Sequence, residues 1–388
     1  MSVAPSIQQL GDYRLIRLLG AGGMGDVYFG VSPTADRVAV KVIKQHLLAD
    51  STIRKRFAAE VESLRVVWGS RVARLEAADP LGDPAWLAVE YVPGSTLSQY
   101  VEQREPLPLP LVAMIGAMLA DGLDRVHQAG LLHRDLKPHN IILGRDGPVL
   151  IDFGLAVLTE RGDYLTDPGA IVGTPHYMSP ERIRGERDQA VGPDIYGLAA
   201  TLVFALTGRN LYSAAGGMHG LILQITDPDV LPDFSGVPVE VVPLLGAMLA
   251  HDPSARPSLS VVRTRLLAIA TSGGIPVIEM RRRVGELTFD GSNEIMVPPE
   301  FTDPIQDPED STAGGGSDDG DVDDRVVVDG DAGSRADGGG GPETRVDPNP
   351  PGRLPTTLVD PDPPDRQRAE VGWLTDQLRR QYARRGTL

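Results

Sequence analysis

The sequence predicts an α+β fold of two lobes, in which a small β-rich lobe precedes a larger α-helical lobe and a disordered acidic C-terminal tail. Three observations predict it. Residues 13–45 alternate apolar and polar side chains, many of them β-branched, with glycines in between. From about Leu107 to about Ala270 the apolar residues recur mostly at helical spacing. Residues 301–365 are rich in Gly, Pro and Asp and cannot bury enough apolar area to offset chain entropy.

The β-rich lobe is predicted to begin with a strand, a tight turn and a second strand, and a third strand ends at Lys41. Residues 51–67 come next as a predicted helix. Its apolar face comes from side chains three or four positions apart, Ile53, Phe57, Val61 and Leu64. Two further runs, Val72–Ala78 and Ala85–Val89, are predicted as strands.

Composition limits the class of protein. The 388 residues, 41% of them hydrophobic, are enough for one large domain with extensions. Since there is no cysteine, a disulfide framework and a thiolate metal site are excluded, and a reducing cytoplasm is the predicted location. The longest apolar runs, Leu109–Ala120 and Gly197–Leu206, are too short for a membrane span of about 20 residues. The N-terminus lacks the pattern of a secretion signal.

The charge is unevenly distributed. The whole chain carries −16, but residues 301–365 hold 17 acidic residues and four Arg, a net of −13. Residues 366–388 are basic and are predicted to form a short amphipathic helix. Its apolar stripe consists of Val371, Leu374, Leu378 and Tyr382. The acidity therefore belongs to the tail, and nothing in the folded part indicates a nucleic-acid partner.

Residues 271–300, a short segment between the helical lobe and the tail, allow two predictions. In the first, Arg283–Phe289 and Asn293–Val297 flank Asp290–Ser292, which is a plausible hairpin turn. In the second, the segment is an irregular strap on the larger lobe. The sequence favours neither.

Five short motifs occur in order along the chain: Gly20–Val27, Val38–Lys41, His133–Asn140, Asp152–Gly154 and Ser179–Glu181. Each alone is weak, and a lone GxGxxG run is common in a chain with 44 Gly. Together, in this order and spacing, they resemble the signature of the protein kinases, and the bacterial eukaryotic-like (Hanks-type) Ser/Thr kinases look most similar. The resemblance covers about residues 13–268. It implies a smaller N-lobe at about 13–92 and a larger C-lobe at about 93–268.

The resemblance implies an ATP-dependent protein serine/threonine kinase, which transfers the γ-phosphate of ATP to Ser or Thr hydroxyls of protein substrates. ATP and Mg²⁺ are the implied cofactors, with Mn²⁺ as an alternative metal. Gly20, Gly22 and Gly25 would let a hairpin backbone lie close over the phosphates, where a Cβ would obstruct the approach.

Lys41 is the cation that the resemblance places on the α- and β-phosphates, and an anion must fix its position. Glu60 is the expected anion, since Leu64 one turn later matches an apolar residue that the family buries. Glu62 is the alternative. It lies about 200° around the helix from Glu60, so only one of the two can face Lys41.

The catalytic loop of the family corresponds to residues 133–140. Asp135 is the implied acceptor that orients a substrate hydroxyl toward the γ-phosphate. Lys137 would stabilise charge on the transferred group, and a Lys at this place resembles the Ser/Thr subclass. Asn140 and Asp152 would supply the oxygen ligands that Mg²⁺ prefers.

The adenine pocket is implied in the same way, because Leu87–Val92 matches the short hinge between the lobes of the family. The implied pocket residues are Val27 and Ala39 for the roof, Ile142 for the floor, Val89 as the gatekeeper, and the backbone of Glu90 and Val92 for hydrogen bonds to the base. Apolar residues at these places also fit ordinary core packing, and both interpretations can be true.

The activation segment of the family corresponds to residues 152–181. Thr174 matches the Thr that relatives place beside the catalytic Asp, so it is assigned to the active site. Thr166, together with Thr159, is the predicted autophosphorylation site, because Arg134 offers a cation to a phosphorylated loop residue. The alternative is that these are unmodified polar loop residues.

Two further matches lie in the larger lobe. Glu181 is expected to pair with Arg256, and Asp194 is expected to brace the catalytic loop, as the corresponding residues do in relatives. Both extend the resemblance beyond the nucleotide site and argue against a chain that has kept only nucleotide motifs.

The tail contains a repeat, since residues 344–353 and 357–366 match at seven of ten positions. Thr344 and Thr357 each have Asp three positions later, which resembles the phosphothreonine motif that forkhead-associated domains bind. Both are therefore predicted docking sites for such a domain, and a duplicated spacer without a partner is the alternative. The helix at 366–388 could bind an acidic partner, dock on the kinase lobe or pair with the acidic tail.

The alternative function from another class is a pseudokinase scaffold that presents phosphothreonine docking sites. An intact set of catalytic residues argues against it, namely Lys41, Glu60, Asp135, Asn140 and Asp152. A kinase for small molecules is the third hypothesis, and the peptide-docking character of residues 173–181 argues against that one. The sequence does not specify the protein substrate, the activating signal or the oligomeric state, and a homodimer is the arrangement considered for trans-autophosphorylation.

Overall fold

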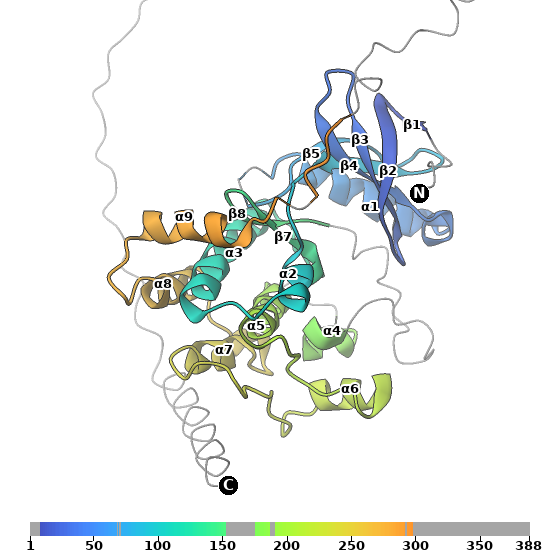
Figure 1. The fold of residues 1–388 in the computed structure, drawn as a ribbon. Helices are drawn as coiled ribbons and strands as arrows, with labels where there is room; N and C mark the ends of the chain where they lie inside the picture. The colour runs from blue at the N-terminus through green and yellow to red at the C-terminus, as the bar shows by residue number, and fades with distance from the viewer. Residues whose placement is uncertain are drawn as a thin grey trace, which may run out of the picture. The chain divides into compact units, whose positions relative to one another are not determined.

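An antiparallel six-stranded sheet forms the N-terminal lobe (Figure 1). The computed structural model describes residues 8–67, 69, 71–152, 175–186, 191–291 and 293–297. The strand order is β1–β2–β3–β4–β6–β5, and each neighbouring pair is antiparallel. The strands are β1 (Gln9–Leu10), β2 (Tyr13–Ala21), β3 (Gly25–Val31), β4 (Arg37–Ile43), β5 (Leu75–Asp79) and β6 (Trp86–Glu90).

Alternation along the strands gives the sheet two apolar faces. In β4, Val38 and Val40 pack in a cluster with Trp86, whereas Ile43 packs in a different cluster. The register of β4 sets the site, because it places Lys41 opposite Val27 of β3 on one side and opposite a β6 residue on the other. The three strands predicted within residues 13–45 are confirmed as β2, β3 and β4, and the third ends at Ile43, two residues after its predicted end at Lys41.

One helix covers the sheet on the side of Ile43. It is α1 (Ser51–Leu64), which begins where the Asp50 side chain accepts a hydrogen bond from the Thr52 N–H (2.7 Å). Three of the four apolar residues predicted for its inner face are buried, namely Phe57, Val61 and Leu64, and Ile53 is partly buried. The helix prediction for residues 51–67 is therefore confirmed, apart from its last turn.

The fifth strand begins later than predicted. Val72, the first residue of the predicted run, forms an isolated parallel bridge with Leu150 instead of joining the sheet. The strand itself starts at Leu75, and the sixth strand is close to its prediction. Val72 is 5% exposed and belongs to the core of the C-terminal lobe, so its apolar character reflects that packing.

Helices dominate the C-terminal lobe (Figure 1). They are α2 (Leu97–Gln103), α3 (Leu109–Gln128), α4 (Pro180–Ile183), α5 (Gly192–Thr207), α6 (Gly217–Thr226), α7 (Val242–Met248), α8 (Leu259–Ala270) and α9 (Val277–Thr288), with the hairpin β7 (Ile141–Gly144) and β8 (Gly147–Leu150). Two apolar helices, α3 and α5, lie at the centre and are buried along most of their length. Among the described residues, no helix has the length and apolar character that crossing a bilayer requires.

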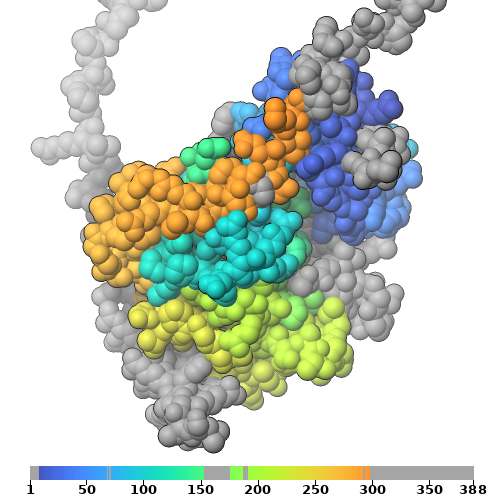
Figure 2. Space-filling view, in the orientation of Figure 1, coloured from blue at the N-terminus to red at the C-terminus, as the bar shows by residue number. Residues whose placement is uncertain are grey.

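The hairpin predicted within residues 271–300 is wrong, because Val277–Thr288 forms helix α9. The second prediction, an irregular strap, fits the described residues after α9, where Gly291 and Asn293 have positive φ angles, but this strap leaves the larger lobe. It runs past the connection between the lobes to the N-terminal sheet, as the orange band of Figure 2 shows. The acidic tail (301–365) and the basic helix (366–388) lie outside the described residues.

Candidate active site

One buried carboxylate holds the loop between α3 and β7 in place. Asp194 of α5 is 1% exposed and accepts hydrogen bonds from the backbone N–H groups of His133 (2.8 Å) and Arg134 (2.7 Å). The Nε2 atom of His127 lies 2.8 Å from the same carboxylate. Burial alone would raise the pKa of Asp194, but His127 and His133 outweigh it and hold the pKa below its ordinary value. This bracing role was expected from the sequence for Asp194, but not for His127.

The braced loop presents a second carboxylate, Asp135, with two donors around it. The Lys137 Nζ atom lies 2.7 Å from Asp135 Oδ2. The Asn140 Nδ2 atom donates to the Asp135 carbonyl (2.7 Å) and to Asp135 Oδ2 (3.1 Å). Burial would raise the pKa of Asp135, but the charge and hydrogen bond of Lys137 outweigh it, so the pKa lies below its ordinary value. Asp135 is therefore a carboxylate at neutral pH and can accept a hydrogen bond from a hydroxyl group.

The N-terminal sheet contributes a cation to the same place. Lys41 of β4 is 7% exposed, and its Nζ atom lies 2.9 Å from Asp152 Oδ2. Asp152 comes just after β8, and the backbone N–H of Ile151 donates to the Asn140 carbonyl (3.0 Å). Four predicted site residues from both lobes are thus linked. Lys41 pairs with Asp152, and the Asn140 side chain donates to Asp135. The Asn140 carbonyl accepts from Ile151, the residue before Asp152.

The glycine-rich turn between β2 and β3 lies at the edge of the sheet. The Gly22 N–H donates to the Gly25 carbonyl (2.9 Å), which closes the turn, and Lys44 Nζ donates to the Gly22 carbonyl (2.6 Å). A Cβ at Gly25 would lie 2.1 Å from the Val42 carbonyl oxygen, so Gly25 is required by packing on β4. Around Gly20, by contrast, a Cβ would meet nothing within 4 Å. Of the three glycines, Gly25 thus has a second role that the sequence did not indicate.

The predicted adenine residues come from three neighbouring strands and from β7. Ala39 of β4 pairs with Val89 of β6, and Val27 of β3 pairs with Lys41 of β4. Ile142 of β7 bridges to Thr96, just beyond the hinge. The side chains of this set are all partly exposed, namely Val27, Ala39, Val89, Val92 and Ile142. Glu90, whose backbone was predicted to bind the base, is exposed at the end of β6.

Comparison with known proteins agrees with this geometry. Residues 13–266 match the family model described as "Protein kinase domain". The chain belongs to the protein kinase family. It is similar to the serine/threonine-protein kinase AfsK of Streptomyces griseus (39% identity over 255 residues, 64% of this chain and 31% of AfsK). It is also similar to PknK of Mycobacterium tuberculosis (33% over 271 residues, 68% of this chain and 24% of PknK).

Among solved structures, the PknI kinase domain of Mycobacterium tuberculosis is similar to this chain with a TM-score of 0.54 and 26% identity. That match covers 69% of this chain and 98% of the PknI domain. The chain spans about a third of the length of the curated relatives it matches first. The two-lobed kinase fold predicted from the sequence is confirmed, and a kinase domain implies the use of ATP.

One ion pair of the kinase domain differs from the expected arrangement. Glu60 of α1, predicted to hold Lys41, forms a hydrogen bond and an ion pair with the Arg134 guanidinium of the catalytic loop. Among the described residues, Lys41 forms its ion pair with Asp152, and no ion pair joins it to Glu60. The rival Glu62 is exposed and pairs with Arg65, so the structure favours Glu60 over Glu62 as the inward residue. Two other ion pairs, Lys41–Asp152 and Glu60–Arg134, thus replace the expected Lys41–Glu60 contact.

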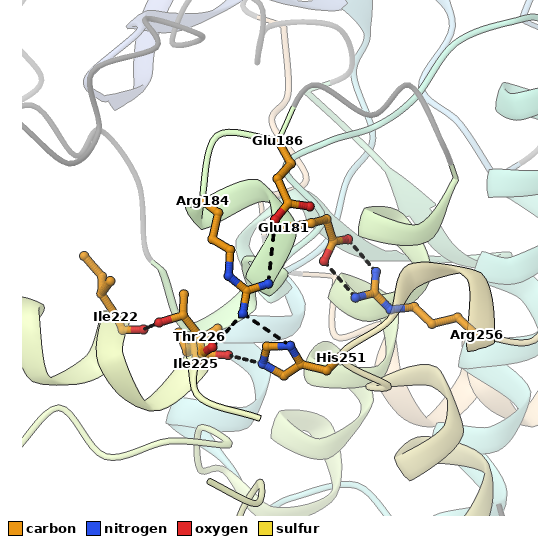
Figure 3. Close-up of polar contacts among 8 residues, drawn as sticks. All are labelled: Glu181, Arg184, Glu186, Ile222, Ile225, Thr226, His251 and Arg256. Atoms are coloured by element: carbon orange, nitrogen blue, oxygen red, sulfur yellow. Dashed lines mark hydrogen bonds and ion pairs between the residues drawn. The ribbon is translucent and has the colours of Figure 1, made fainter. Parts of the chain in front are cut away.

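The larger lobe of the kinase contains the expected brace, drawn in Figure 3. Both carboxylate oxygens of Glu181 accept hydrogen bonds from Arg256, at 2.6 and 2.8 Å, and the two side chains are almost fully buried. Burial would raise the pKa of Glu181, but the hydrogen bonds and charge of Arg256 outweigh it and hold the pKa below its ordinary value. Nearby, Arg184 donates to the Thr226 carbonyl (2.6 Å), which ties α4 to α6.

Several predicted residues lie outside the described part of the chain. These are Thr174, assigned to the active site, the candidate phosphorylation sites Thr159 and Thr166, and the tail residues Thr344 and Thr357. Their assignments stay predictions.

Proposed function

We propose that the chain is an ATP- and Mg²⁺-dependent protein serine/threonine kinase, which transfers the γ-phosphate of ATP to Ser and Thr hydroxyls of proteins. One observation carries the proposal, namely that site residues of the two lobes are in contact. Asp135, held by Lys137 and Asn140, lies in the same lobe as Asp152. Asp152 in turn contacts Lys41 of the other lobe. Phosphoryl transfer depends on positioning and charge stabilisation, and this cluster supplies both. The relatives named above support the serine/threonine class.

The role proposed for each site residue is based on its contacts. Asp135 accepts the hydrogen bond of the substrate hydroxyl and orients its oxygen toward the γ-phosphate. Lys137, 2.7 Å from Asp135, stabilises negative charge on the group in transfer. Lys41 holds the α- and β-phosphates. In the proposal Gly20, Gly22 and Gly25 cover the phosphates, while Glu90 and Val92 bind adenine through their backbone.

The donor set fits Mg²⁺. The Asn140 Nδ2 atom is directed at Asp135, so the amide oxygen is available as a ligand, and the Asp152 side chain is 34% exposed. Within the described residues no cluster of three or more His, Asp or Glu forms a complete metal cage. Mg²⁺ does not need one, since it commonly takes one or two protein ligands and completes its shell with phosphate oxygens and water. When bound there with ATP, it would neutralise charge on the β- and γ-phosphates. Mn²⁺ prefers the same ligand type.

Activation is proposed to act through Arg134. A phosphate on Thr166, or on Thr159, would compete with Glu60 for the Arg134 guanidinium. Once released, Glu60 could approach Lys41 and take it from Asp152, which would leave the Asp152 carboxylate to the metal. The ion pairs of the described residues support the starting point of this exchange. Thr174 is proposed to lie beside Asp135.

The tail is proposed to dock a forkhead-associated domain through phosphorylated Thr344 and Thr357. A tether on the same chain raises the local concentration of these residues near the kinase, which favours their autophosphorylation. Trans-phosphorylation in a homodimer is the proposed route for the activation segment. The proposed location is the cytoplasm, where ATP is abundant.

Incubation with γ-³²P-ATP and Mg²⁺ tests the proposed activity. The wild-type chain is expected to label itself and an added acceptor protein on Ser or Thr. Asp135→Asn should lower the labelling rate by about 10² to 10⁴, because the hydroxyl loses its oriented acceptor. The control is Asp12→Asn, which changes an exposed Asp in the turn between β1 and β2 and should leave the rate unchanged. Equal labelling by wild type and Asp135→Asn, or none by either, would contradict the proposal and favour a pseudokinase scaffold.

A further inference from the structure

A segment that extends beyond the part matching the family model contacts both lobes. It consists of α9 and the described residues after it, 289–291 and 293–297, and it is called the strap here. In Figure 2 its orange surface runs from the C-terminal lobe to the blue strands of the sheet.

The strap is fixed to the larger lobe by α9. Met280 and Val284 are 2% and 0% exposed and belong to the same apolar core as α3. A Cβ at Gly285 would lie 2.1 Å from the Arg145 carbonyl oxygen, so the helix backbone lies directly against the β7–β8 turn. The Arg145 guanidinium in turn lies 4.9 Å from the centre of the Phe289 ring. This end of the strap is therefore part of the lobe core.

The middle of the strap contacts the hinge. The Tyr91 hydroxyl donates to the Asn293 carbonyl, and Asn293 Nδ2 donates to the Gly94 carbonyl (3.3 Å). The Ser95 hydroxyl donates to Asp290 Oδ2 (3.2 Å). The connection between the lobes is thus hydrogen-bonded to the strap at three of its residues.

Asp290 also forms an ion pair with Arg104 at the end of α2. The Arg104 Nη2 atom lies 3.3 Å from Asp290 Oδ2, and the Asp290 side chain is 13% exposed. One turn earlier, the Tyr100 hydroxyl donates to the Leu287 carbonyl (3.1 Å). These contacts fix the start of the extended part against the helix that comes after the hinge.

The end of the strap packs on the sheet. Ile295 and Val297 lie against the cluster of Phe29, Val31 and Tyr91, while Met296 between them is 88% exposed. This alternation is typical of an extended segment with one buried side. The Tyr91 ring packs edge-on against the Phe29 ring, with the ring centres 4.8 Å apart. Tyr91 therefore contacts the strap through its hydroxyl and the sheet core through its ring.

We propose that the strap is a second connection between the lobes that positions the hinge, with Tyr91 as the principal positioning residue, and thereby sets the affinity for nucleotide. Tyr91 lies between Glu90 and Val92, the two residues proposed to bind adenine, so fixing its side chain fixes the backbone on both sides. The inference rests on the proposed function, since it assigns the strap a role at the same nucleotide site.

The strap acts on affinity through the conformations that the hinge can adopt. If the hinge samples several of them, the apparent Kd for nucleotide rises by the inverse of the fraction that can bind. The two apolar contacts of Ile295 and Val297 and the hydrogen bond of Tyr91 favour one conformation. Loss of the strap contact should therefore weaken nucleotide binding, and raise KM for ATP, more than it lowers kcat, because among the described residues no hydrogen bond or ion pair joins the strap to Asp135.

Two variants of the full chain test the inference. The first carries Ile295→Ser and Val297→Ser, which remove the apolar contact with the sheet. Its matched control is Met296→Ser, which makes the same kind of chemical change on the exposed side of the same segment. The second variant is Tyr91→Phe, which keeps the ring packing and removes only the hydroxyl, so it preserves the sheet core.

The measurements are the Kd for ADP by calorimetric titration, hydrogen exchange at the Glu90 and Tyr91 amides, and the separate KM and kcat values. The double variant is expected to raise the Kd about tenfold and Tyr91→Phe about threefold, with faster exchange at both amides. Met296→Ser should match wild type. A Kd and exchange rates equal to the control in both variants would overturn the inference. Loss of phosphoryl transfer in wild type would refute the proposed function instead, since exchange at the hinge still measures the strap.

Discussion

Glu181 and Asp194 are almost fully buried carboxylates and Asp135 is a partly buried one, and the pKa of each lies below its ordinary value. Burial opposes ionisation in all three, and a specific partner outweighs it: Lys137 for Asp135, Arg256 for Glu181, and histidines with backbone N–H groups for Asp194. Asp135, which carries the proposed chemistry, and Asp194, which holds the catalytic loop, thus stay negatively charged for the same reason: a specific partner outweighs the effect of burial.

The Glu181–Arg256 pair gives a stability prediction. Glu181→Gln leaves the Arg256 guanidinium buried without a counter-charge, so the free energy of unfolding should fall by about 3–5 kcal/mol. Glu186→Gln is the matched control just after the same short helix, since Glu186 is exposed and lies 3.8 Å from Arg184. It should change the free energy by less than about 1 kcal/mol. Urea unfolding measures both, and similar losses in the two variants would contradict the assignment.

The same pair fixes the sign of a pH effect. Because the folded pKa of Glu181 is below the ordinary 4.5, the pair stabilises the fold above pH 4.5 and loses that contribution as the pH falls through the lowered folded value. The difference in unfolding free energy between wild type and Glu181→Gln should therefore be largest near neutral pH and shrink in acid. A difference that does not change with pH would show that the ionised carboxylate is not responsible.

At the scale of elements, most of the secondary structure could be predicted from periodicity. The buried face of α1 and the alternation in β2 to β4 are examples, since apolar spacing alone defines them. The hairpin prediction within 271–300 failed because Asp290–Ser292 is typical of a turn and Gly285 weakens the helical signal before it. Met280 and Val284 are four apart and Glu279 pairs with Arg282 and Arg283, which are helical signals.

Helix α9 gives a prediction of its own. Gly285→Ala would place a Cβ 2.1 Å from the Arg145 carbonyl oxygen, so the backbone must shift and the free energy of unfolding should fall by about 1–3 kcal/mol. Gly220→Ala is the control inside α6, where a Cβ meets nothing within 4 Å. That change should stabilise the chain by about 0.5–1 kcal/mol, because Ala favours a helix over Gly. Thermal unfolding measures the free-energy change of both variants, and a stabilising effect of Gly285→Ala would refute the close packing.

At the scale of the whole molecule, the site is shared between lobes that meet at the hinge. Sequence motifs could assign Lys41, Asp135 and Asp152 to one cleft, because their order and spacing match a family. They could not give the partner of Glu60, since that depends on how α1 is placed against the catalytic loop. Nor could they place the strap, which is one of two predictions for residues 271–300, because it lies beyond the matched residues and its contacts with the hinge and the sheet are long-range.

The position of α1 leads to a further prediction. Glu60→Gln removes the inward anion that is proposed to alternate between Arg134 and Lys41, so phosphoryl transfer should fall at least about tenfold. Glu62→Gln changes an exposed residue of the same helix and should leave the rate within about twofold. Initial rates with γ-³²P-ATP compare the two. The same loss in both, or a loss only in Glu62→Gln, would reverse the assignment.

The central claim is that residues from both lobes converge on one nucleotide. A crystal structure of the full chain with Mg²⁺ and a non-hydrolysable ATP analogue tests it most directly. We expect adenine against the backbone of Glu90 and Val92, phosphates beside Lys41, and Mg²⁺ held by Asn140 and Asp152. A nucleotide bound elsewhere on the surface, or density without contact to Lys41 and Asp152, would contradict it.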